Sequence, residues 1–232
     1  WLGDGSTNQP EITSADSEIV DYLQHYCDNR YFKLSKREQP NNKSSVYRIT
    51  NERKRSTGLI PLMRAYNLLG FKHIPTDYKI NSEKNRLELL AGILDSDGHL
   101  AKGHYDVVFK SEKLMDDLVF LARSLGFAAH KKECQKTCTN NGVTGTYFRT
   151  TICGDVSRIP TKLKRHQPEP RKQKKSVLVT GITVEKLEIG EYYGFDISGD
   201  RLFMLGDFTV THNTLIKAFM AEKFSKRNEL VV

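Results

Sequence analysis

The sequence has 232 residues, enough for one large domain or two small ones, and no apolar run in it is long enough to cross a bilayer. Lysine and arginine number 36 against 28 acidic residues, for a net charge of +8; this favours a polyanionic partner such as nucleic acid, although an ordinary basic protein fits the charge equally well. The four cysteines form no CxxC pair and are typical of reduced thiols, and no signal peptide is recognisable, so we expect an intracellular protein, cytoplasmic or nuclear.

The first quarter of the chain predicts a helix followed by a β-hairpin. Asp16 or Ser17 is a candidate cap for a helix whose apolar residues recur at helical spacing. The segments 30–37 and 45–50 are rich in aromatic and β-branched residues, and the turn-forming pair Asn-Asn at 41–42 lies between them. We therefore expect two antiparallel strands joined at this turn.

The middle of the chain predicts two helices. Residues 56–70 carry apolar side chains at helical spacing and precede Phe-Lys-His-Ile-Pro at 71–75. Ser82 is a candidate N-cap of the second helix, which ends in Leu-Ala-Gly-Ile-Leu-Asp-Ser-Asp-Gly at 90–98. The Ala-Gly pair of this segment falls on the packing face, where a glycine costs about 1 kcal/mol relative to alanine. We therefore expect a second backbone to approach the helix closely there.

Two carboxylates, Asp95 and Asp97, lie at the C-terminus of this helix, where the helix dipole disfavours negative charge. A tight helix pair that ends in carboxylates is unfavourable by itself and becomes favourable around a divalent cation. The order of elements after Asp97 repeats the order after Asp4, 93 residues earlier. The second copy is expected to contain a strand at 105–110, a helix from Ser111 to Gly126, a strand at 128–133, a turn at 140–142 and a strand at 146–153.

The segment 90–98 resembles the LAGLIDADG motif of homing endonucleases and matches it at six of nine positions. The opening residues, Trp-Leu-Gly-Asp-Gly-Ser at 1–6, resemble the end of the first such motif in the endonucleases of inteins. We therefore interpret the sequence as a fragment whose first motif is truncated. The resemblance implies an α+β, two-repeat fold with αββαββα-like halves, which form a saddle on double-stranded DNA with a long recognition site.

The same resemblance assigns the active-site residues. It implies that Asp4 and Asp97 bind Mg²⁺ ions that serve the hydrolysis of both DNA strands, and that Lys72 assists them. The second lysine would come from the basic run near the end of this region, where Lys164 is our choice and Lys162 the alternative. The basic run is equally compatible with a solvated linker that touches phosphate without a catalytic role.

The resemblance also leaves an alternative function. Some LAGLIDADG proteins bind nucleic acid without cutting it, as maturases or decayed nucleases do. The presence of both Asp4 and Asp97 argues against this alternative, because a pure binder has no need of two carboxylates beside phosphates. We expect the chain to act as a monomer.

A different domain is expected from residue 176, because β-branched residues alternate at strand spacing over 178–188 and a further strand follows at 192–198. A hairpin is predicted over 201–211, and the chain then reads His-Asn-Thr. This arrangement resembles the C-terminal splicing block of inteins, which forms the β-rich C-terminal part of a Hint fold. The catalytic residues that this resemblance implies are Asp196, His212, Asn213 and Thr214.

Each of these four residues would have a separate task in splicing. The Asn213 side-chain amide would attack its own carbonyl carbon and cut the chain before Thr214, while His212 donates a proton to the departing amide. The Thr214 hydroxyl would accept the upstream acyl group, and Asp196 would orient the reacting groups. Because the N-terminal splicing block is absent from the sequence, we expect that this fragment cannot splice.

The last nineteen residues differ again and are expected to be the start of a host protein. A helix that begins with Thr214 and leads to an apolar strand resembles the segment after the Gly-Lys of a P-loop ATPase or helicase. An ATPase fragment is thus a second alternative, limited to this end of the chain. The predicted domains are an endonuclease at 1–175, the splicing block at 176–213 and the host segment at 214–232.

Overall fold

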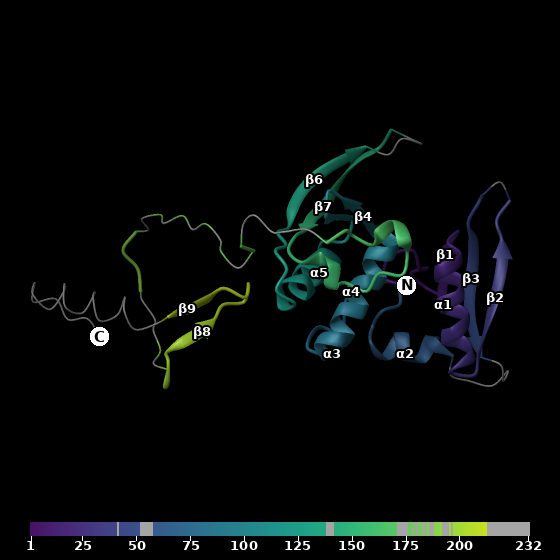
Figure 1. Ribbon diagram of the computed structural model, residues 1–232, viewed down its shortest axis with the longest axis horizontal. Helices are drawn as coiled ribbons and strands as arrows, with labels where there is room; N and C mark the ends of the chain where they lie inside the picture. Colours follow the sequence, from purple (N-terminus) through teal and green to yellow (C-terminus); the bar gives the residue numbers. More distant parts are fainter. Residues whose placement is uncertain are drawn as a thin grey trace, which may run out of the picture. The chain divides into compact units, whose positions relative to one another are not determined.

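The computed structural model divides the chain into two units, Trp1–Val179 and Thr180–Val232. The residues that it describes are 1–40, 42–51, 58–137, 142–170, 176, 177, 179, 181, 183, 185, 188–191, 195 and 197–212. Within these residues, no helix combines the length and the apolar character that a membrane crossing requires. The first unit is a mixed α/β structure with two antiparallel sheets (Figure 1).

The first sheet lies near the start of the chain. Its elements are β1 (Glu11–Ser14), α1 (Ser17–Asp28), β2 (Phe32–Glu38) and β3 (Ser45–Asn51). The strand order is β1-β3-β2, and α1 covers one face of the sheet because Leu23 and Cys27 pack against Ile49. The predicted hairpin is confirmed, whereas β1 was not predicted. Asp16 occupies the predicted cap position, but its side chain makes no cap hydrogen bond and pairs instead with Arg165.

Three helices follow: α2 (Leu59–Ala65), α3 (Thr76–Lys79) and α4 (Glu83–Asp97). The helix predicted over 56–70 is shorter than expected, because Asn67 adopts a left-handed conformation (φ +53°) that no helix continues through. The cap predicted for α4 is confirmed: the Ser82 side chain accepts a hydrogen bond from the Asn85 N–H at 3.3 Å. The short helix α3 was not predicted.

The close approach expected at Gly92 of α4 is not observed, so this prediction is wrong for the described chain. Gly92 is exposed, and a methyl group placed on it would meet no atom within 4 Å. The close approach is made one turn later, where Gly3 lies against Ser96. The reason is that residues 1–8 form turns rather than a helix, so they reach only the end of α4.

The second sheet follows α4 directly. Its elements are β4 (Gly98–Ala101), β5 (His104–Phe109), α5 (Glu112–Ser124), β6 (Lys132–Thr137) and β7 (Thr144–Ile152), in the strand order β4-β5-β7-β6. Ser111 caps α5 by accepting from the Leu114 N–H at 3.2 Å, as predicted. The strand predicted at 128–133 begins only at Lys132, because Ala128 makes an isolated bridge with Cys153 instead.

The main hydrophobic core lies between α4, α5 and the second sheet and contains twenty buried residues. Leu90 and Leu94 of α4, Tyr105 and Val107 of β5, and Leu118 of α5 are almost completely buried in it. The first sheet and α1 share a separate cluster with three buried residues. The end of α4, which carries the candidate site, is therefore fixed by the larger core.

The second unit contains one described hairpin, β8 (Leu202–Met204) paired with β9 (Val210–His212), which confirms the hairpin predicted over 201–211. The strands predicted at 178–188 and 192–198 lie largely outside the described residues, and those of their residues that are described are not in strands. The predicted host segment at 214–232 lies outside the described residues.

Candidate active site

Asp4 lies in a loop that hydrogen bonds tie to the first sheet. The Asp4 carbonyl accepts from the Thr13 N–H of β1 at 3.2 Å, and Gly5 bridges Ile12 of the same strand. The Trp1 indole donates to the Gln9 carbonyl at 2.9 Å and closes the loop. These contacts fix the backbone on both sides of the Asp4 carboxylate.

Asp97 is the last residue of α4, and the chain turns directly from this helix into β4 at Gly98. A Cβ atom at Gly98 would lie 2.5 Å from the Leu94 carbonyl oxygen, so only glycine allows the strand to start there. The helix–strand junction thus places the Asp97 carboxylate at the end of the core rather than within it.

The loop and the helix end meet at Gly3. A Cβ atom at Gly3 would lie 2.1 Å from Ser96 Oγ and 2.3 Å from Asp97 Oδ2, which means that the backbone of Gly3 lies against both side chains. The Lys72 ammonium donates a hydrogen bond to the Gly3 carbonyl at 2.6 Å and lies 5.3 Å from the centre of the Trp1 ring. Three separate segments therefore converge on Gly3.

The electrostatics place Asp4, Asp97 and Lys72 within reach of one another. Burial raises the pKa of Asp97, and the Asp4 carboxylate raises it further. Burial likewise raises the pKa of Asp4, while Lys72 acts to lower it. Burial lowers the pKa of Lys72, and the charges of Asp97 and Asp4 oppose that effect. The site is a group of two carboxylates and one amine, in which Asp97 and Lys72 are half-buried and Asp4 is exposed.

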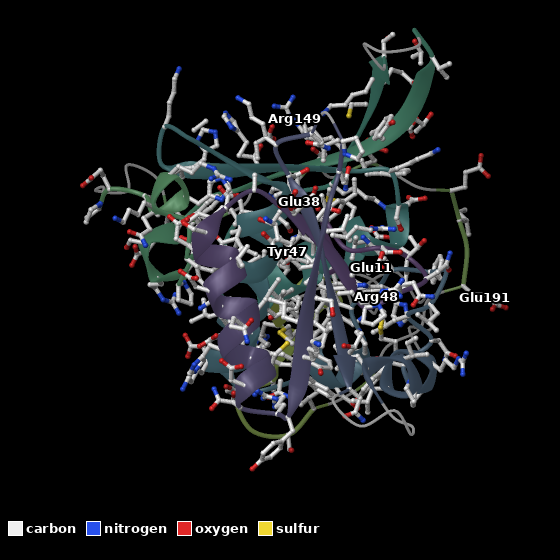
Figure 2. The ribbon with its side chains drawn as sticks, turned by 90° about the vertical axis from the view of Figure 1, so that its right-hand side faces the viewer. Glu11, Glu38, Tyr47, Arg48, Arg149 and Glu191 are labelled. Atoms are coloured by element: carbon white, nitrogen blue, oxygen red, sulfur yellow. The ribbon has the colours of Figure 1, made fainter. Side chains whose placement is uncertain are left out.

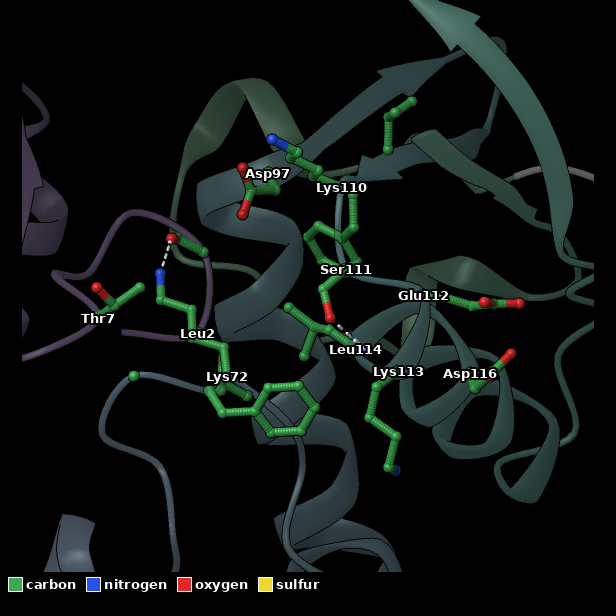
Figure 3. Close-up of a pocket in the computed structure, with 15 residues that line it drawn as sticks. Leu2, Thr7, Lys72, Asp97, Lys110, Ser111, Glu112, Lys113, Leu114 and Asp116 are labelled. Atoms are coloured by element: carbon green, nitrogen blue, oxygen red, sulfur yellow. Dashed lines mark hydrogen bonds between the residues drawn. The ribbon is translucent and has the colours of Figure 1, made fainter. Parts of the chain in front are cut away.

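An open pocket of about 910 Å³ lies beside this group (Figure 3). One side is formed by Leu2, Gly3, Lys72 and Asp97, and the other by the end of β5 and the start of α5. The second wall carries two basic and two acidic residues, which are Lys110, Lys113, Glu112 and Asp116. Asp97 and Lys72 thus line an open pocket whose walls carry charges of both signs.

A buried carboxylate of α5 holds the segment that carries Lys72. Asp117 is almost fully buried and accepts from the Ile74 N–H at 2.9 Å, from Lys79 at 2.7 Å and from Lys113 at 2.6 Å. Burial acts to raise the pKa of Asp117, but these hydrogen bonds outweigh it and leave the pKa below its ordinary value. Because Ile74 is only two residues from Lys72, this contact fixes the backbone from which the Lys72 side chain reaches Gly3.

Asp95 has a structural role rather than the cation-binding role considered for it from the sequence. It is buried, and its two oxygens accept from the Lys162 N–H at 2.8 Å and the Leu163 N–H at 3.2 Å. This contact fastens the segment that precedes the short 3-10 helix η2 (Lys164–His166) to the end of α4. Asp95 therefore positions the basic run.

The two candidates for the second lysine lie on this segment. The Lys162 ammonium lies 4.5 Å from the centre of the Tyr22 ring of α1, and Lys164 is exposed. Next to them, Arg165 donates to both oxygens of Asp16, with 2.8 Å between Nη2 and Oδ2. The structure thus places Lys162 against α1 and leaves Lys164 exposed, whereas Lys72 lies at Gly3.

Sequence reasoning missed the structural roles of three residues of this site. Gly3 precedes the aspartate of a Gly-Asp-Gly segment, and its role depends on α4, which is distant in sequence. Asp117 carried a usable signal, because it falls on the apolar stripe of α5 between Leu114 and Leu121, where a charged residue needs a partner. Asp95 was noticed, but its backbone partners are 67 and 68 residues away.

Three of the four predicted splicing residues lie outside the residues that the structure describes. His212 is the last residue of β9, opposite Leu202 in the register. Asp196, Asn213 and Thr214 lie outside the described residues. The assignment of these four residues stays a prediction.

One protein-family model resembles the second half of the first unit. Residues 73–176 match the homing endonuclease family model. The matched region contains Asp97, Asp95 and Asp117, while Asp4 and Lys72 precede it.

Two curated relatives resemble a larger part of the chain. The replicative DNA helicase DnaB of Mycobacterium intracellulare is 34% identical over 129 residues, which are 55% of this chain and 18% of the helicase. The homothallic switching endonuclease of Saccharomyces cerevisiae is 26% identical over 253 residues, 89% of this chain and 41% of that protein. The chain therefore spans less than half of each relative.

Solved structures of the homing endonuclease I-DmoI are also similar to the chain. A mesophilic variant is 11% identical with a TM-score of 0.43, covering 62% of this chain and 72% of the variant. I-DmoI in complex with DNA and Mn is 10% identical with a TM-score of 0.40, covering 62% and 72% of the two chains.

Proposed function

We propose that the first unit is a site-specific endonuclease of the LAGLIDADG homing type, which cuts double-stranded DNA with Asp4 and Asp97 as its metal-binding residues. The observation that carries the proposal is the convergence of three segments at Gly3: the loop that contains Asp4, the end of α4 with the Asp97 side chain against Gly3, and Lys72, which donates to the Gly3 carbonyl. The match of residues 73–176 to the homing endonuclease model supports the class of reaction.

The donor set fits a divalent cation such as Mg²⁺. Proteins bind Mg²⁺ through one or two carboxylates and leave the other positions to water and substrate phosphates. Among the described residues no group of three or more His, Cys, Asp or Glu side chains that could hold a metal is found, so the proposed protein ligands are the two carboxylates alone. Burial raises the pKa of both carboxylates, the Asp4 charge raises that of Asp97 further, and a bound cation would offset these effects. When bound, the cation supplies Lewis acidity toward the scissile phosphate.

Lys72 is suited to contact the substrate beside the carboxylates. Its ammonium has three N–H donors, and the Gly3 carbonyl takes one of them. The remaining donors can hold an oxygen of the scissile phosphate in a half-buried setting, where such contacts are stronger than in water. We propose the same task for Lys164, or Lys162, at the second strand of the substrate.

The two sheets support a two-part reading of the DNA. The strand order β1-β3-β2 in the first sheet matches the order β5-β7-β6 in the second. In the chain, α1 connects β1 to β2, and α5 likewise connects β5 to β6. We infer that the two form an internal repeat of αββαββα-like halves, each of which contacts one half of a long recognition site. A single chain with both halves would act as a monomer.

We also propose that this nuclease is encoded within an intein. The similarity of part of the chain to a replicative DNA helicase supports a helicase as the host protein. In this proposal residues 176–213 are the C-terminal part of a Hint domain, with Asp196, His212, Asn213 and Thr214 in the splicing roles given above. Residues 214–232 belong to the host, whose cellular location the protein would share.

The test is cleavage of the host gene from which the coding sequence of this chain has been removed. The full-length protein is incubated with that DNA and Mg²⁺, in parallel with Asp97→Asn, Asp4→Asn and the control Asp21→Asn. Asp21 is an exposed carboxylate of α1, so its substitution removes one charge away from the site. We expect one discrete double-strand cut that the control retains and both site variants lose by at least about 1,000-fold, which equals about 4 kcal/mol of activation free energy.

Two outcomes would overturn the assignment. Tight binding without a cut, under every divalent cation tried, would favour the alternative of a non-cleaving DNA-binding protein. Equal cleavage by Asp97→Asn and the wild type would remove Asp97 from the active site.

A further inference from the structure

Each of the two sheets carries one carboxylate–arginine pair on the face that its helix leaves uncovered. The pairs are Glu11 with Arg48 in the first sheet and Asp106 with Arg149 in the second. In both sheets the acid comes from the strand before the helix, β1 or β5, and the arginine from the central strand β3 or β7 to which it pairs. The same device thus occurs once in each half.

In the first sheet the two side chains belong to residues directly opposite each other (Figure 2). Arg48 Nε donates to Glu11 Oε1 at 2.6 Å, and Arg48 Nη2 lies 2.5 Å from the same oxygen. Arg37 Nη2 lies 3.9 Å from the second oxygen of Glu11. The acid is therefore held between two basic residues of neighbouring strands.

In the second sheet the contact is bidentate. Arg149 Nε donates to Asp106 Oδ1 and Nη2 to Oδ2, both at 2.7 Å. The Val108 position opposes Arg149 in the register, so the pair runs diagonally across two strands. A bidentate contact fixes the plane of the guanidinium as well as its position.

Both pairs lie away from the helices, because side chains alternate between the two faces of a strand. In β5 the neighbours of Asp106, Tyr105 and Val107, are buried in the core with α5. In β3 the neighbours of Arg48, Tyr47 and Ile49, belong to the cluster with α1. The two pairs thus lie on the faces turned away from α1 and α5, where both arginines are about half exposed.

Exposure separates the two members of each pair. The acid side chains are only 13% and 17% exposed, while Arg48 and Arg149 are 48% and 55% exposed. Ion pairs with a solvent-exposed partner contribute modestly to folding stability, so stability alone does not account for a similar acid–arginine pair in both halves. The acid is therefore largely shielded from solvent at the sheet surface, and the arginine extends from it into solvent.

The remaining donors of each arginine form a recognition edge. A guanidinium has five N–H donors, and the acid takes two on the Nε side. The far edge, formed by the two terminal nitrogens, keeps its N–H groups available in a fixed plane. Guanine offers two acceptors, O6 and N7, side by side in the major groove and suits such an edge. The exposed Lys33 of β2 and Lys132 of β6 lie on the same faces and suit the adjacent phosphates.

We propose that Arg48 and Arg149 each read one guanine in the major groove, one in each half of the site, and that Glu11 and Asp106 are the positioning residues that fix the two guanidinium planes. This inference rests on the proposed DNA-binding function and assigns its specificity. Because the acid orders the arginine before binding, the complex avoids part of the entropy cost of ordering a long side chain.

The test is a selection of bound duplexes from a pool of randomised DNA, with Ca²⁺ as the divalent cation. The full-length wild type is compared with Arg149→Lys, Arg48→Lys, Asp106→Ala, Glu11→Ala and the control Glu38→Ala. Glu38 pairs with Lys36 on β2 but its side chain is 80% exposed, so its removal changes the charge equally without releasing an arginine.

We expect the wild type to recover a motif with a required guanine in each half. Arg149→Lys keeps the charge but loses the planar fork, so it should lower the preference for one of these guanines by about 5- to 150-fold and leave the other unchanged. Arg48→Lys should show the reverse. Asp106→Ala and Glu11→Ala should lower the same preferences by about 2- to 12-fold, while affinity for the random pool stays equal or rises because a negative charge is lost.

Opposite results would overturn the proposal. If the lysine variants recover the wild-type motif unchanged, the arginines contact phosphates or nothing at all. If the acid variants lower both the preference and the affinity for the random pool, the acids serve the fold alone. If the wild type recovers no motif, the proposed sequence-specific DNA binding itself is wrong. Unchanged lysine variants, or acid variants that lose affinity, would refute only the roles of the arginines and acids.

Discussion

The two sheets of the first unit share one strand order and differ in how much core they build. The order β1-β3-β2 corresponds to β5-β7-β6. The second sheet packs with α4 and α5 around twenty buried residues, whereas the first packs with α1 around three. Similar connections are thus stabilised by two helices in one half and by one helix in the other.

Topology and stability therefore have separate origins in this unit. The alternation of apolar residues is enough to define the hairpins of both halves, but each buried aliphatic side chain contributes about 1.5–3 kcal/mol. The second half therefore holds most of the folding free energy. The first half depends on individual contacts with the rest of the unit, among them Lys72 with Gly3 and Arg165 with Asp16.

The largest expected effect tests the two cores directly. Leu118→Ala, at a fully buried position of α5, should lower the free energy of unfolding by about 4 kcal/mol, because the dense core cannot collapse around the cavity. Leu23→Ala in α1 should cost about 2.5 kcal/mol, since its smaller cluster can rearrange. Urea unfolding followed by circular dichroism and by the fluorescence of Trp1 measures both. Equal losses would refute the asymmetry.

The next effect compares a buried with an exposed anchor. Asp117→Asn leaves Lys79 without its charge partner beside a buried amide and should cost about 3 kcal/mol. Asp16→Asn breaks the exposed pair with Arg165 and should cost at most about 1 kcal/mol. The same urea experiment measures both. In a cleavage assay Asp117→Asn should also lower kcat, because Lys72 loses its anchored neighbour Ile74.

Acid pH gives this anchor a second test. The folded-state pKa of Asp117 lies below its ordinary value, so its contribution to stability is complete above the unfolded pKa of about 3.9. That contribution is lost as the pH falls from there through the folded pKa. Asp117→Asn should therefore show a shallower loss of stability below about pH 4. A parallel loss in both proteins would contradict the assignment.

A smaller effect concerns the segment that closes the first unit. His166 is buried, and burial together with Arg165 lowers its pKa, against the opposing charges of Asp95 and Asp16. The unfolded chain therefore takes up a proton at a higher pH than the folded chain, and stability should rise with pH up to about 6.5. The slope in this window should reach at most about 1.4 kcal/mol per pH unit.

Urea midpoints between pH 5 and pH 8 measure this slope. His166→Gln should flatten it, whereas His25→Gln, on the exposed surface of α1, should retain it. A slope that is the same in all three proteins would exclude His166 as its source.

The smallest expected effect concerns the helix between the two halves. Gly92→Ala in the 232-residue chain should raise the free energy of unfolding by about 0.5–1 kcal/mol, because the helix gains propensity and the new methyl group meets no atom within 4 Å. Thermal unfolding measures the change. A loss of stability would mean that another backbone packs on α4 at this position.

The sequence predicts the long elements of this fold better than the short ones. Helices α4 and α5 follow from caps at Ser82 and Ser111 and from apolar residues at helical spacing, and both caps are observed. Strands β1 and β4 have four residues each, too few to establish a period. The early end of α2 depends on the left-handed conformation of Asn67, which the spacing of apolar residues does not predict.

Some residues of the candidate site could also be predicted from the sequence, and others could not. Asp4, Asp97 and Lys72 could be selected because they belong to recognisable segments, and the structure brings these segments together at Gly3. Asp117, which anchors the segment of Lys72, and Asp95, which positions the basic run, act through contacts with distant backbone. Such contacts depend on tertiary structure, so periodicity and composition do not reveal them.

The long contacts also have a consequence for the order of folding. Lys72 and Gly3 are 69 residues apart, Lys162 and Asp95 are 67 apart, and Arg165 and Asp16 are 149 apart. Closing long loops costs more chain entropy than closing a hairpin, so we expect the hairpins and α5 to form first. The two carboxylates would then meet only in the last step, and a partly folded chain would carry no assembled catalytic pair.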